Sequence, residues 1–463
     1  MMLTVTDIVK ATGGRVVKPG PDGVVFKGVS TDSRTVGAGE LFVPIVGERF
    51  DGHDFIEAAF AKGASGALTM PGKGASSRGN VCQIEVDDTL RALGAIAHYI
   101  RDARRDLVVV GITGTNGKTT TKEMLASVLS VRGPVLKNAG NLNNEIGLPL
   151  TLMGLDETHW AAVLEMGMSG FGEIARLAKI AEPQVGVITN IGPGHLETLG
   201  SMEGVARAKG ELIEVLPRDG KAVLNLDDPY LKGLLVKNKS RAVTFGLRPG
   251  AMVTAGDIKE TAHGVSFRLA VPGGVAAISL PVMGTHNVYN ALAAAAAALT
   301  AGLTVKEIKQ GLEAFSPVKM RMEVLDIGGV RVINDAYNAN PASMAASLNA
   351  FASVKEGRRI AVLGDMLELG PSASKAHFDV GRLAGAEGMA LLVLMGEHAA
   401  ETAKGALESG MDEADVVVAD GPEAAAEALS ERLRKGDHVL VKGSRGMRME
   451  RVIELLKTRR VVA

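Results

Sequence analysis

Apolar and polar residues alternate along the middle of the chain in blocks that are typical of α/β proteins. Short apolar runs, each long enough for one buried strand, are separated by segments with helical spacing of apolar residues. This alternation predicts a mainly parallel sheet with helices on both faces, and it predicts a ligand site at the carboxyl ends of the strands. The predicted strands are residues 107–110, 161–164, 185–188 and 222–226.

The same alternation returns in the last third of the chain, after a predicted linker at residues 316–321. An alanine-rich helix at residues 291–300 precedes this linker, and we interpret its alanines as a sign of close helix packing. Beyond the linker we predict a second, smaller α/β domain of Rossmann-like character, without the Gly-x-Gly-x-x-Gly loop that binds dinucleotides. Its predicted strands are residues 330–333, 360–363, 391–395, 416–419 and 438–441.

The first hundred residues contain shorter elements. A capped helix is predicted at residues 4–12, and strand-like runs follow at 24–26 and 41–43. A basic helical segment around residues 101–106 marks the boundary with the middle of the chain. The predicted fold class is therefore α/β with three domains. A small N-terminal α/β domain is predicted at residues 1–103. A central parallel-sheet domain is predicted at residues 104–318 and a C-terminal Rossmann-like domain at residues 319–463.

The amino-acid composition limits the classes of protein to which this chain could belong. A chain of 463 residues with 46% hydrophobic residues can bury several cores. Its 51 basic and 52 acidic residues balance, which argues against nucleic acid as a partner. The single cysteine, Cys82, cannot form an internal disulfide, residues 1–14 lack a signal-peptide pattern, and no apolar run is long enough to span a bilayer. We therefore expect a cytoplasmic protein that does not insert into membranes.

One glycine-rich stretch gives the clearest indication of a ligand-binding site. Residues 111–120 have the sequence Gly-Ile-Thr-Gly-Thr-Asn-Gly-Lys-Thr-Thr and open a helical pattern at residues 118–131. Glycines let main-chain N–H groups turn toward phosphates, a lysine reaches their outer oxygens, and a threonine hydroxyl can hold Mg²⁺. The strict P-loop pattern has glycine where this chain has Ile112, so an ordinary helix N-terminus is the alternative. We favour a P-loop ATPase domain that binds a nucleoside triphosphate through Gly114, Thr115, Asn116, Gly117, Lys118, Thr119 and Thr120.

Three further polar residues follow the predicted strands of the central domain. Glu165 comes directly after one of them, where a carboxylate beside a P-loop could bind Mg²⁺, although it could also be a surface acid in a turn. His195 is ambiguous because Mg²⁺ prefers oxygen ligands and lone histidines are often structural. Lys209, taken by itself, has the pattern of a lysine on a helix surface.

Polar segments in the two outer domains could also bind a ligand. Two loops, residues 30–34 and 47–55, contain hydroxyls, arginine and aromatic rings, which could bind a sugar nucleotide. Composition alone, however, favours ordinary solvated turns. In the third domain, polar clusters follow three predicted strands. Each could be a helix cap or a turn, but three on one sheet edge suggest a cleft shared with the nucleotide domain. These clusters are residues 334–341, 364–370 and 442–446.

Taken together, the motifs resemble those of the Mur ligases, the ATP-dependent amide ligases that build the peptidoglycan stem peptide. The resemblance covers essentially the whole chain. The motifs shared by several members are residues 113–120, 192–197, 208–211 and 286–290. Residues 138–147, 335–341 and 363–370 resemble the member that adds D-alanyl-D-alanine.

The resemblance implies an ADP-forming amide ligase. ATP would phosphorylate the terminal carboxylate of UDP-N-acetylmuramoyl-tripeptide, and the amine of D-alanyl-D-alanine would displace phosphate to form the pentapeptide precursor of peptidoglycan. It also implies two Mg²⁺ ions, a carbamylated Lys209 and closure of the third domain over the cleft, which would keep water from the acyl phosphate. The third stem residue would be diaminopimelate or lysine, and we expect a monomer.

The resemblance also implies roles for residues whose own patterns are ambiguous. The N-terminal domain would bind the UDP-sugar, and the UDP-substrate set is Ser30, Asp32, Ser33, Arg34, Gly47 and Asn141. Besides the glycine loop, the ATP contacts would be Asn287, Arg321, Asp335, Tyr337 and Asn338. Metal would be held by Thr119, Glu165, His195 and Lys209, and the catalytic residues would be Lys118, His195 and Lys209.

Two alternatives stay open. Within the same family, the chain could be a ligase that adds a single amino acid as the third stem residue. The strings Asp-Asn-Pro and Ala-His-Thr-Pro that such ligases usually carry in the C-terminal domain do not occur here. In a different class, the chain could be a P-loop kinase or nucleotide switch whose outer domains are binding modules.

Overall fold

The computed structural model describes residues 2–74, 76, 78–238, 241–261 and 264–459. The chain forms two compact units. One consists of Met1–Thr113, Arg132–Gly186 and Glu211–Lys221, and the other of Gly114–Val131, Val187–Gly210 and Ala222–Ala463. The domain boundaries expected after residues 103 and 318 stay predictions.

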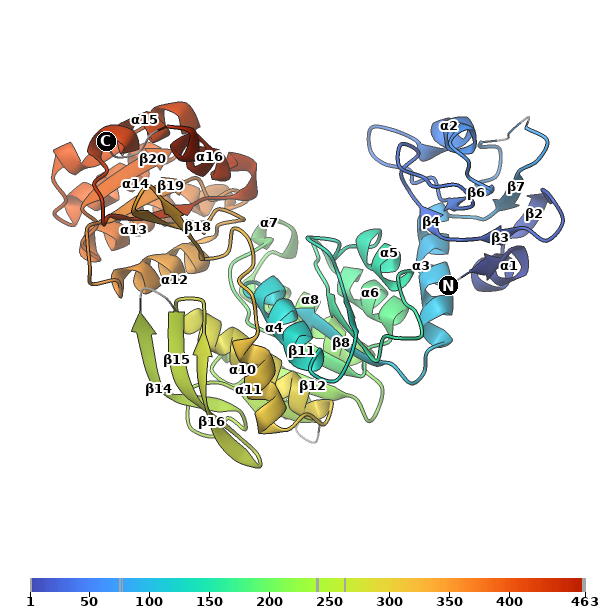
Figure 1. The fold of residues 1–463 in the computed structure, drawn as a ribbon, viewed down its shortest axis with the longest axis horizontal. Coiled ribbons are helices and arrows are strands. Elements are labelled where there is room, and N and C mark those ends of the chain that lie inside the picture. The colour runs from blue at the N-terminus through green and yellow to red at the C-terminus, as the bar shows by residue number, and fades with distance from the viewer. Residues whose placement is uncertain (1, 75, 77, 239–240, 262–263, 460–463) are drawn as a thin grey trace. The chain divides into compact units, whose positions relative to one another are not determined.

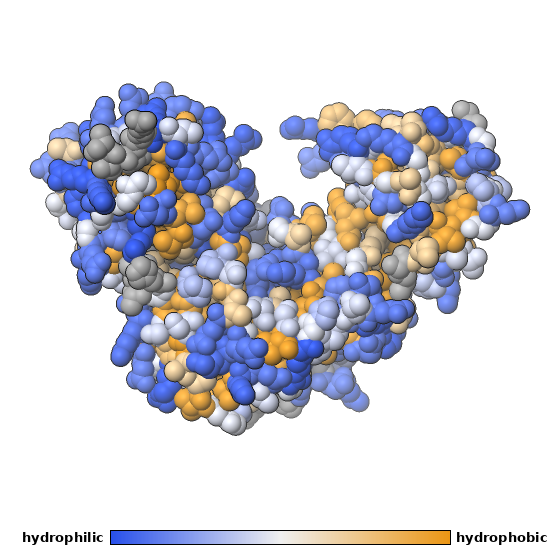
Figure 2. All heavy atoms as spheres, viewed as in Figure 1, coloured by the Kyte–Doolittle hydropathy of each residue, from blue (hydrophilic) through white to orange (hydrophobic). Residues whose placement is uncertain are grey.

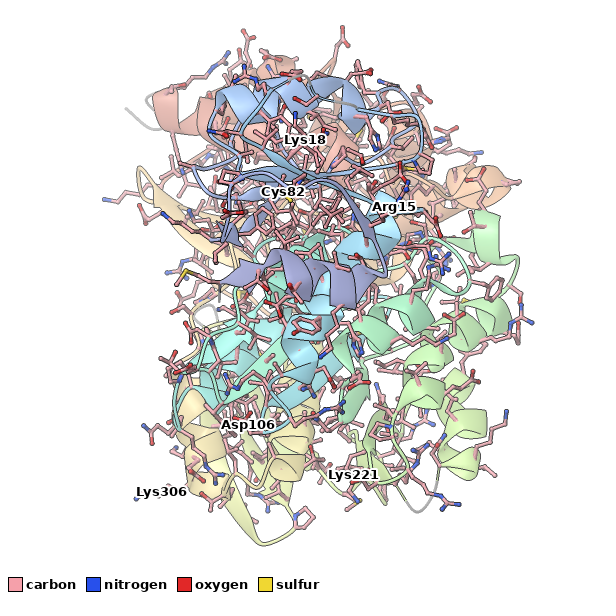
Figure 3. The ribbon with its side chains drawn as sticks, turned by 90° about the vertical axis from the view of Figure 1, so that its right-hand side faces the viewer. Arg15, Lys18, Cys82, Asp106, Lys221 and Lys306 are labelled. Atoms are coloured by element: carbon pink, nitrogen blue, oxygen red, sulfur yellow. The ribbon has the colours of Figure 1, made fainter. Side chains whose placement is uncertain are left out.

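A five-stranded sheet with the strand order β2-β7-β6-β5-β4 forms the N-terminal region. A capping box between Thr4 and Asp7 starts α1, and Gly13 ends it with a φ of 68°, so the predicted first helix is confirmed. Cys82 is buried in β7, which pairs with the strand that carries Arg15 and Lys18 (Figure 3). The elements are β1 Leu3–Thr4, α1 Val5–Thr12, β2 Arg15–Lys18, β3 Val25–Phe26, β4 Val29–Ser30, β5 Leu41–Phe42, α2 Ile56–Ala61, β6 Gly66–Thr69, β7 Cys82–Glu85 and α3 Thr89–Asp102.

The central sheet has six strands in the order β13-β12-β11-β8-β10-β9. Strand β10 pairs parallel with β8 and β9, and β12 pairs parallel with β13, which confirms the predicted parallel sheet. The strands are β8 Val108–Thr113, β9 Val135–Lys137, β10 Ala161–Glu165, β11 Val185–Ile188, β12 Lys221–Asn225 and β13 Ala242–Phe245. The helices are α4 Lys118–Leu129, α5 Gly147–Leu152, α6 Glu173–Ala181, α7 Leu196–Leu199, α8 Met202–Val215 and α9 Lys232–Lys237.

An antiparallel three-stranded sheet follows, for which the sequence analysis proposed no element. It comprises β14 Thr254–Thr261, β15 Gly264–Val271 and β16 Gly274–Leu280. Helices α10 Thr285–Thr300 and α11 Val305–Glu313 come next and pack on α4 (Figure 1). Residues 291–298 of α10 are fully buried, which confirms the interpretation of the alanine run as close packing. Gly311 lets α11 approach α4, because a Cβ there would overlap the Val128 backbone.

The last domain is built on a sheet with the order β17-β18-β22-β19-β20-β21, in which only β17 runs antiparallel to its neighbour among the described pairings. Helices α12 to α14 cover one face, and α15 and α16 cover the other (Figure 1). The strands are β17 Glu323–Ile327, β18 Val330–Asp335, β19 Arg359–Gly364, β20 Leu391–Met395, β21 Val416–Val418 and β22 His438–Lys442. The helices are α12 Pro341–Ala352, α13 Ala373–Ala386, α14 Ala399–Glu408, α15 Pro422–Arg432 and α16 Glu450–Thr458.

Among the described residues, no helix combines the length and apolar character needed to cross a bilayer. Figure 2 shows hydrophilic side chains over most of the visible face, with apolar residues in small groups. Such scattered apolar residues are ordinary for a protein surface.

The expected helical segment around residues 101–106 is wrong, because α3 ends at Asp102 and a turn follows. This helix end is structurally important because it contains Arg101. Its side chain is 1% exposed and donates to the main-chain oxygens of Ala181 (3.0 Å), Arg104 (2.7 Å) and Glu182 (3.3 Å). One buried guanidinium therefore satisfies carbonyl groups at the ends of both α3 and α6.

We predict that Arg101→Ala lowers the free energy of unfolding of this unit by about 2–4 kcal/mol, because it leaves three carbonyls without their donor and opens a cavity. Urea titration followed by the fluorescence of the single tryptophan, Trp160, measures this unit. Arg105→Ala is the control. Its guanidinium is 70% exposed and pairs with Asp102 and Glu182, so its loss should change stability by less than about 1 kcal/mol. Equal effects of the two variants would contradict the prediction.

Candidate active site

The glycine loop joins β8 to α4, as the sequence predicted. Gly114 has a φ of 147° and Gly117 a φ of 81°. A Cβ at Gly114 would overlap the hydroxyl of Thr189, and a Cβ at Gly117 would overlap the side-chain oxygen of Asn290. Both conformation and space therefore require glycine at these two positions.

A second segment, residues 189–192, stabilises the glycine loop by hydrogen bonds to main-chain groups of the loop. Thr115 N donates to Asn190 O (2.9 Å) and Asn116 N donates to Asn190 Oδ1 (3.0 Å). The Asn116 carbonyl accepts from Thr189 Oγ1 (2.7 Å) and Asn190 Nδ2 (3.0 Å). The sequence analysis missed these bracing residues, although they follow β11 directly and precede the Gly-Pro-Gly-His motif.

Lys118 begins α4 and turns back over the loop. Its Nζ donates to the main-chain oxygens of Gly114 (2.9 Å) and Thr115 (3.1 Å). Thr119 and Thr120 follow in the first turn and are nearly buried. A lysine ammonium and a helix N-terminus at the end of a parallel strand are groups that commonly bind anions, and phosphate binding by these residues stays a prediction.

Glu165 and His195 lie at strand ends of the central sheet. Glu165 is the last residue of β10, is 3% exposed, and accepts from Asn143 Nδ2 (2.8 Å). It is level with Ile112 on the neighbouring strand β8, so its position at a strand end is confirmed. His195 has a φ of 55° and precedes α7, and its Nδ1 lies 3.9 Å from the carboxylate of Glu368.

Lys209 corrects the first interpretation of its sequence pattern. The surface position expected from the pattern is wrong, because Lys209 is 3% exposed within α8. Among the described residues no carboxylate forms an ion pair with it. Burial, together with the positive charge of Lys118, holds the pKa of Lys209 well below its usual value. This environment favours the neutral amine more than the environment of an exposed lysine does.

The three polar clusters of the last domain meet at one sheet edge, as predicted. Lys442 Nζ donates to Asp335 Oδ2 (2.5 Å) and to the carbonyl of Asn338 (3.1 Å). Ser444 N donates to the carbonyl of Asp365 (2.9 Å), which joins the second and third clusters. Lys442 is 3% exposed and Asp335 is 9% exposed, so their ion pair is buried.

Arg321 connects the linker to the glycine-loop helix. Its Nη2 donates to Thr119 Oγ1 (2.9 Å), and its guanidinium lies 4.1 Å from the ring centroid of Tyr337. The neighbouring residues Met320 and Met322 have φ values of 58° and 52°, which non-glycine residues rarely adopt. The backbone on both sides of Arg321 is therefore held in a strained form that aims this side chain.

The first turns of α10 contact the same loop. Asn287 is 3% exposed, and its amide donates to the Met283 carbonyl (2.7 Å) and accepts from Asn290 Nδ2 (3.0 Å). Asn290 Oδ1 in turn accepts from Thr121 Oγ1 (3.3 Å). Asn287 thus takes part in a protein network beside the loop, and its contact with adenine stays a prediction.

The residues expected to bind UDP lie on separate exposed segments. Arg34 donates from its main chain (2.8 Å) and from Nε (2.9 Å) to Asp32 Oδ1, and these bonds lower the pKa of Asp32 to about 2. This is the local turn that composition favoured, with the Arg34 side chain 86% exposed. Ser30 ends β4, Ser33 belongs to the same turn, Gly47 to the loop after β5, and Asn141 to the loop between β9 and α5. Their role in UDP binding stays a prediction.

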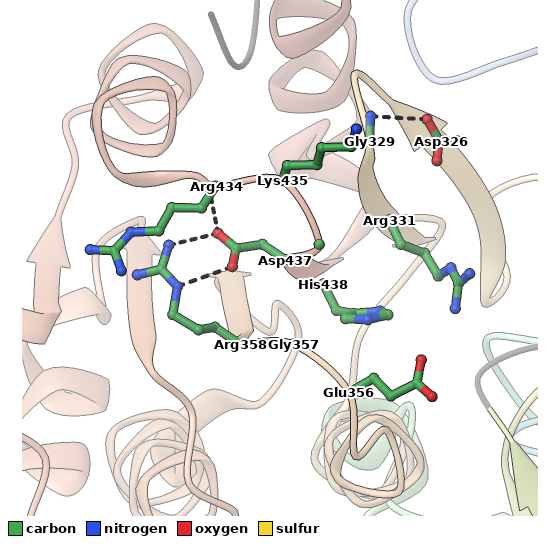
Figure 4. A pocket seen from close by; sticks show the side chains of 11 residues that line it. Asp326, Gly329, Arg331, Glu356, Gly357, Arg358, Arg434, Lys435, Asp437 and His438 are labelled. Carbon is green, nitrogen blue, oxygen red and sulfur yellow. Dashed lines mark hydrogen bonds and ion pairs between the residues drawn. The ribbon is translucent and has the colours of Figure 1, made fainter.

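A pocket of about 530 Å³ opens at the opposite edge of the last sheet (Figure 4). It lies at the amino ends of β18, β19 and β22, whereas the polar clusters lie at their carboxyl ends. Arg358 binds Asp437 through Nε (3.0 Å) and Nη2 (2.6 Å), and Asp437 also accepts from the main chain of Arg434 (2.7 Å). These bonds tie two loops together, so we interpret this pocket as structural.

Three family models match successive parts of the chain. Residues 25–101 match the family described as Mur ligase family, catalytic domain, residues 112–298 match the Mur ligase middle domain, and residues 320–445 match the Mur ligase, glutamate ligase domain. The chain is 37% identical over 457 residues to the UDP-N-acetylmuramoyl-tripeptide--D-alanyl-D-alanine ligase of Bacillus subtilis, covering 97% of both chains.

Solved structures agree with this relationship. The chain resembles a crystal structure of MurF from Acinetobacter baumannii with a TM-score of 0.91 and 32% identity, covering 99% of each chain. It also resembles the MurF ligase of Thermotoga maritima in complex with ADP, with a TM-score of 0.82, 30% identity, and coverage of 93% of this chain and 97% of that chain.

We predict that Gly117→Ala weakens ADP binding by more than about tenfold, because the left-handed backbone disfavours alanine and the added methyl group overlaps Asn290. Isothermal titration with ADP measures this loss. Gly233→Ala is the matched control, since Gly233 lies in α9 and a Cβ there has no described neighbour within 4 Å. Unchanged ADP affinity in Gly117→Ala would contradict the steric argument.

Proposed function

The chain belongs to the Mur ligase family, and we propose that it joins D-alanyl-D-alanine to UDP-N-acetylmuramoyl-tripeptide in an ATP-dependent, ADP-forming reaction. The observation that carries this proposal is the identity of 37% to a ligase of that name over 97% of both chains. The glycine loop, with its two required glycines and its lysine, supports the use of ATP. The product is the pentapeptide precursor of peptidoglycan, and we propose that a monomer makes it in the cytoplasm.

Amide formation needs an activated carboxylate, because a carboxylate at neutral pH does not react with an amine. The terminal carboxylate of the tripeptide attacks the γ-phosphorus of ATP, and ADP leaves. The dipeptide amine then attacks the acyl carbon, phosphate leaves, and the nitrogen loses a proton. Such a sequence depends on positioning and charge neutralisation more than on a protein nucleophile.

The glycine loop supplies the phosphate-binding part of this chemistry. The main-chain N–H groups at the start of α4 hold the phosphates, and Lys118 moves from the loop carbonyls to the phosphate oxygens. Arg321, Tyr337 and Asn338 face the nucleotide from the linker and the last domain, with Asp335 beside them and Asn287 near the adenine. In the N-terminal domain, Arg34, its turn and Gly47 bind the UDP group, together with Asn141 from the loop between β9 and α5.

Two Mg²⁺ ions would neutralise phosphate charge. Thr119 would offer a hydroxyl and Glu165 a carboxylate, both of the oxygen type that Mg²⁺ prefers. Within the described residues, no three His, Cys, Asp or Glu side chains are grouped as a metal site. We propose that His195 has a further anionic partner at the metal. A carbamate on Lys209 would provide one. Its neutral, buried amine is the form that adds to carbon dioxide with loss of a proton.

The experiment that tests the function is ADP release with UDP-N-acetylmuramoyl-tripeptide and different second substrates. We expect release with D-alanyl-D-alanine and little with free amino acids, and we expect Lys118→Ala to abolish it because the phosphates lose their cation. Release with a single amino acid instead would favour the ligase that adds the third residue. Steady ATP turnover without either substrate would favour a nucleotide switch.

We predict that Lys209→Ala loses most of its activity and that acetate at high concentration restores part of it, because a small carboxylate can occupy the vacated space. Acetate should not rescue Lys118→Ala, whose missing group is a cation. A second measurement does not depend on activity. Nuclear magnetic resonance with ¹³C-labelled bicarbonate should show a carbamate carbon in the unmodified sequence and none in Lys209→Ala. Full activity of Lys209→Ala would contradict the proposal.

A further inference from the structure

Two asparagines form a reciprocal amide pair between the glycine loop and the last domain. Asn340 Nδ2 donates to Asn116 Oδ1 (2.8 Å), and Asn116 Nδ2 approaches Asn340 Oδ1 (3.4 Å). Asn116 belongs to the loop that precedes α4, and Asn340 immediately precedes α12. The pair therefore joins the phosphate-binding segment to the first helix of the domain whose strand ends carry Asp335 and Lys442.

The polarity of this pair is set by the helix cap. Asn340 Oδ1 accepts from Ser343 N (2.9 Å), and Asn340 N donates to Ser343 Oγ (2.9 Å). Because the oxygen must face the helix N-terminus, the Nδ2 group is left to point outward as a donor. Asn116 consequently presents its oxygen, and the two amides meet in one defined orientation.

The loop does not need the Asn116 side chain for its own shape. Thr189 and Asn190 hold the main-chain groups of Asn116, and the glycines set the turns on either side. Among the described residues, the Asn116 side-chain amide hydrogen-bonds to Asn340 alone. A polar side chain that the loop itself does not use thus serves the contact with α12.

Helix α12 continues the connection toward the sheet edge. Ser347, on the same helix, donates to Asp335 Oδ2 (2.6 Å), and Asp335 holds Lys442 (2.5 Å). Asp335 Oδ1 also accepts from Met322 N (3.1 Å) in the linker. The position of α12 relative to the glycine loop therefore determines where these strand-end groups lie.

We propose that Asn116 and Asn340 are positioning residues that seat the last domain on the nucleotide-bound glycine loop for the attack of the dipeptide amine. The proposal rests on the ligase function given above and deepens it. Neither side chain touches the reacting atoms. Their bond acts through α12, so it should govern kcat and the use of D-alanyl-D-alanine without forming the nucleotide site or the UDP site.

A double-mutant cycle on the complete chain tests this proposal. Asn116→Ala removes one partner. Asn340→Ser removes the other while serine retains an N-cap oxygen, so α12 should still form. We expect each variant to lower kcat about tenfold, which corresponds to the loss of one hydrogen bond, and the double variant to lower it no further than about twofold beyond either. The KM for UDP-N-acetylmuramoyl-tripeptide should stay within about twofold.

The control separates positioning from helix capping. Ser343→Ala removes the hydroxyl that accepts from Asn340 N but leaves the Asn116–Asn340 pair, so its kcat should stay within about twofold. ADP affinity, measured by titration, should stay within about threefold in Asn340→Ser, because Asn340 lies outside the glycine loop. Circular dichroism of each variant confirms that the helices are present.

Several outcomes would overturn the proposal. Near-normal kcat in both single variants would show that the pair is dispensable, and a hundredfold loss in the double variant would show that the two residues act independently. A tenfold loss of ADP affinity in Asn340→Ser would show that Asn340 acts on nucleotide binding and not on the position of α12. Equal losses of kcat in Ser343→Ala and Asn340→Ser would show that Asn340 acts only as the N-cap of α12. Normal turnover in Lys118→Ala is a distinct result, since it contradicts the proposed function itself.

Discussion

Steric exclusion at two glycines gives the loop between β8 and α4 its shape, and the chemistry of the central domain depends on that shape. Gly114 lies against Thr189 and Gly117 lies against Asn290, in each case without room for a methyl group. The Asn190 side chain then holds the main chain in this form by accepting from Asn116 N and donating to the Asn116 carbonyl. The loop is therefore preorganised for a phosphate chain before any ligand arrives, so binding loses less conformational entropy.

The packing of α10 maintains this arrangement from one side. Its alanines allow α10 to lie close to α4, because larger side chains would separate the two helices. Asn287 and Asn290, at the start of α10, then reach the loop and bond to one another beside Thr121. The alanine run of α10 resembles a low-complexity segment, but its close packing places two buried amide side chains next to the phosphate site.

Two of the buried lysines, Lys442 and Lys209, are accommodated in different ways. Lys442 forms an ion pair with Asp335, and that pair also orders the strand ends of the last domain. Lys209 is buried beside the positive charge of Lys118, which favours the neutral amine. A neutral amine is nucleophilic, whereas the charged form is not. The same residue type therefore has a carboxylate partner at one buried position and a cationic neighbour at another.

The amino-acid sequence by itself determined the α/β class, the parallel central sheet, the Rossmann-like last domain and the glycine loop, because these depend on local periodicity and on short motifs. It also indicated the strand-end positions of Glu165 and Asp335, since parallel strands bring their carboxyl ends to one edge. Only the tertiary structure decided the burial of Lys209, the bracing by Thr189 and Asn190, and the pairing of Asn116 with Asn340. Those properties arise from contacts between residues far apart in the chain, and neither spacing nor composition records such contacts.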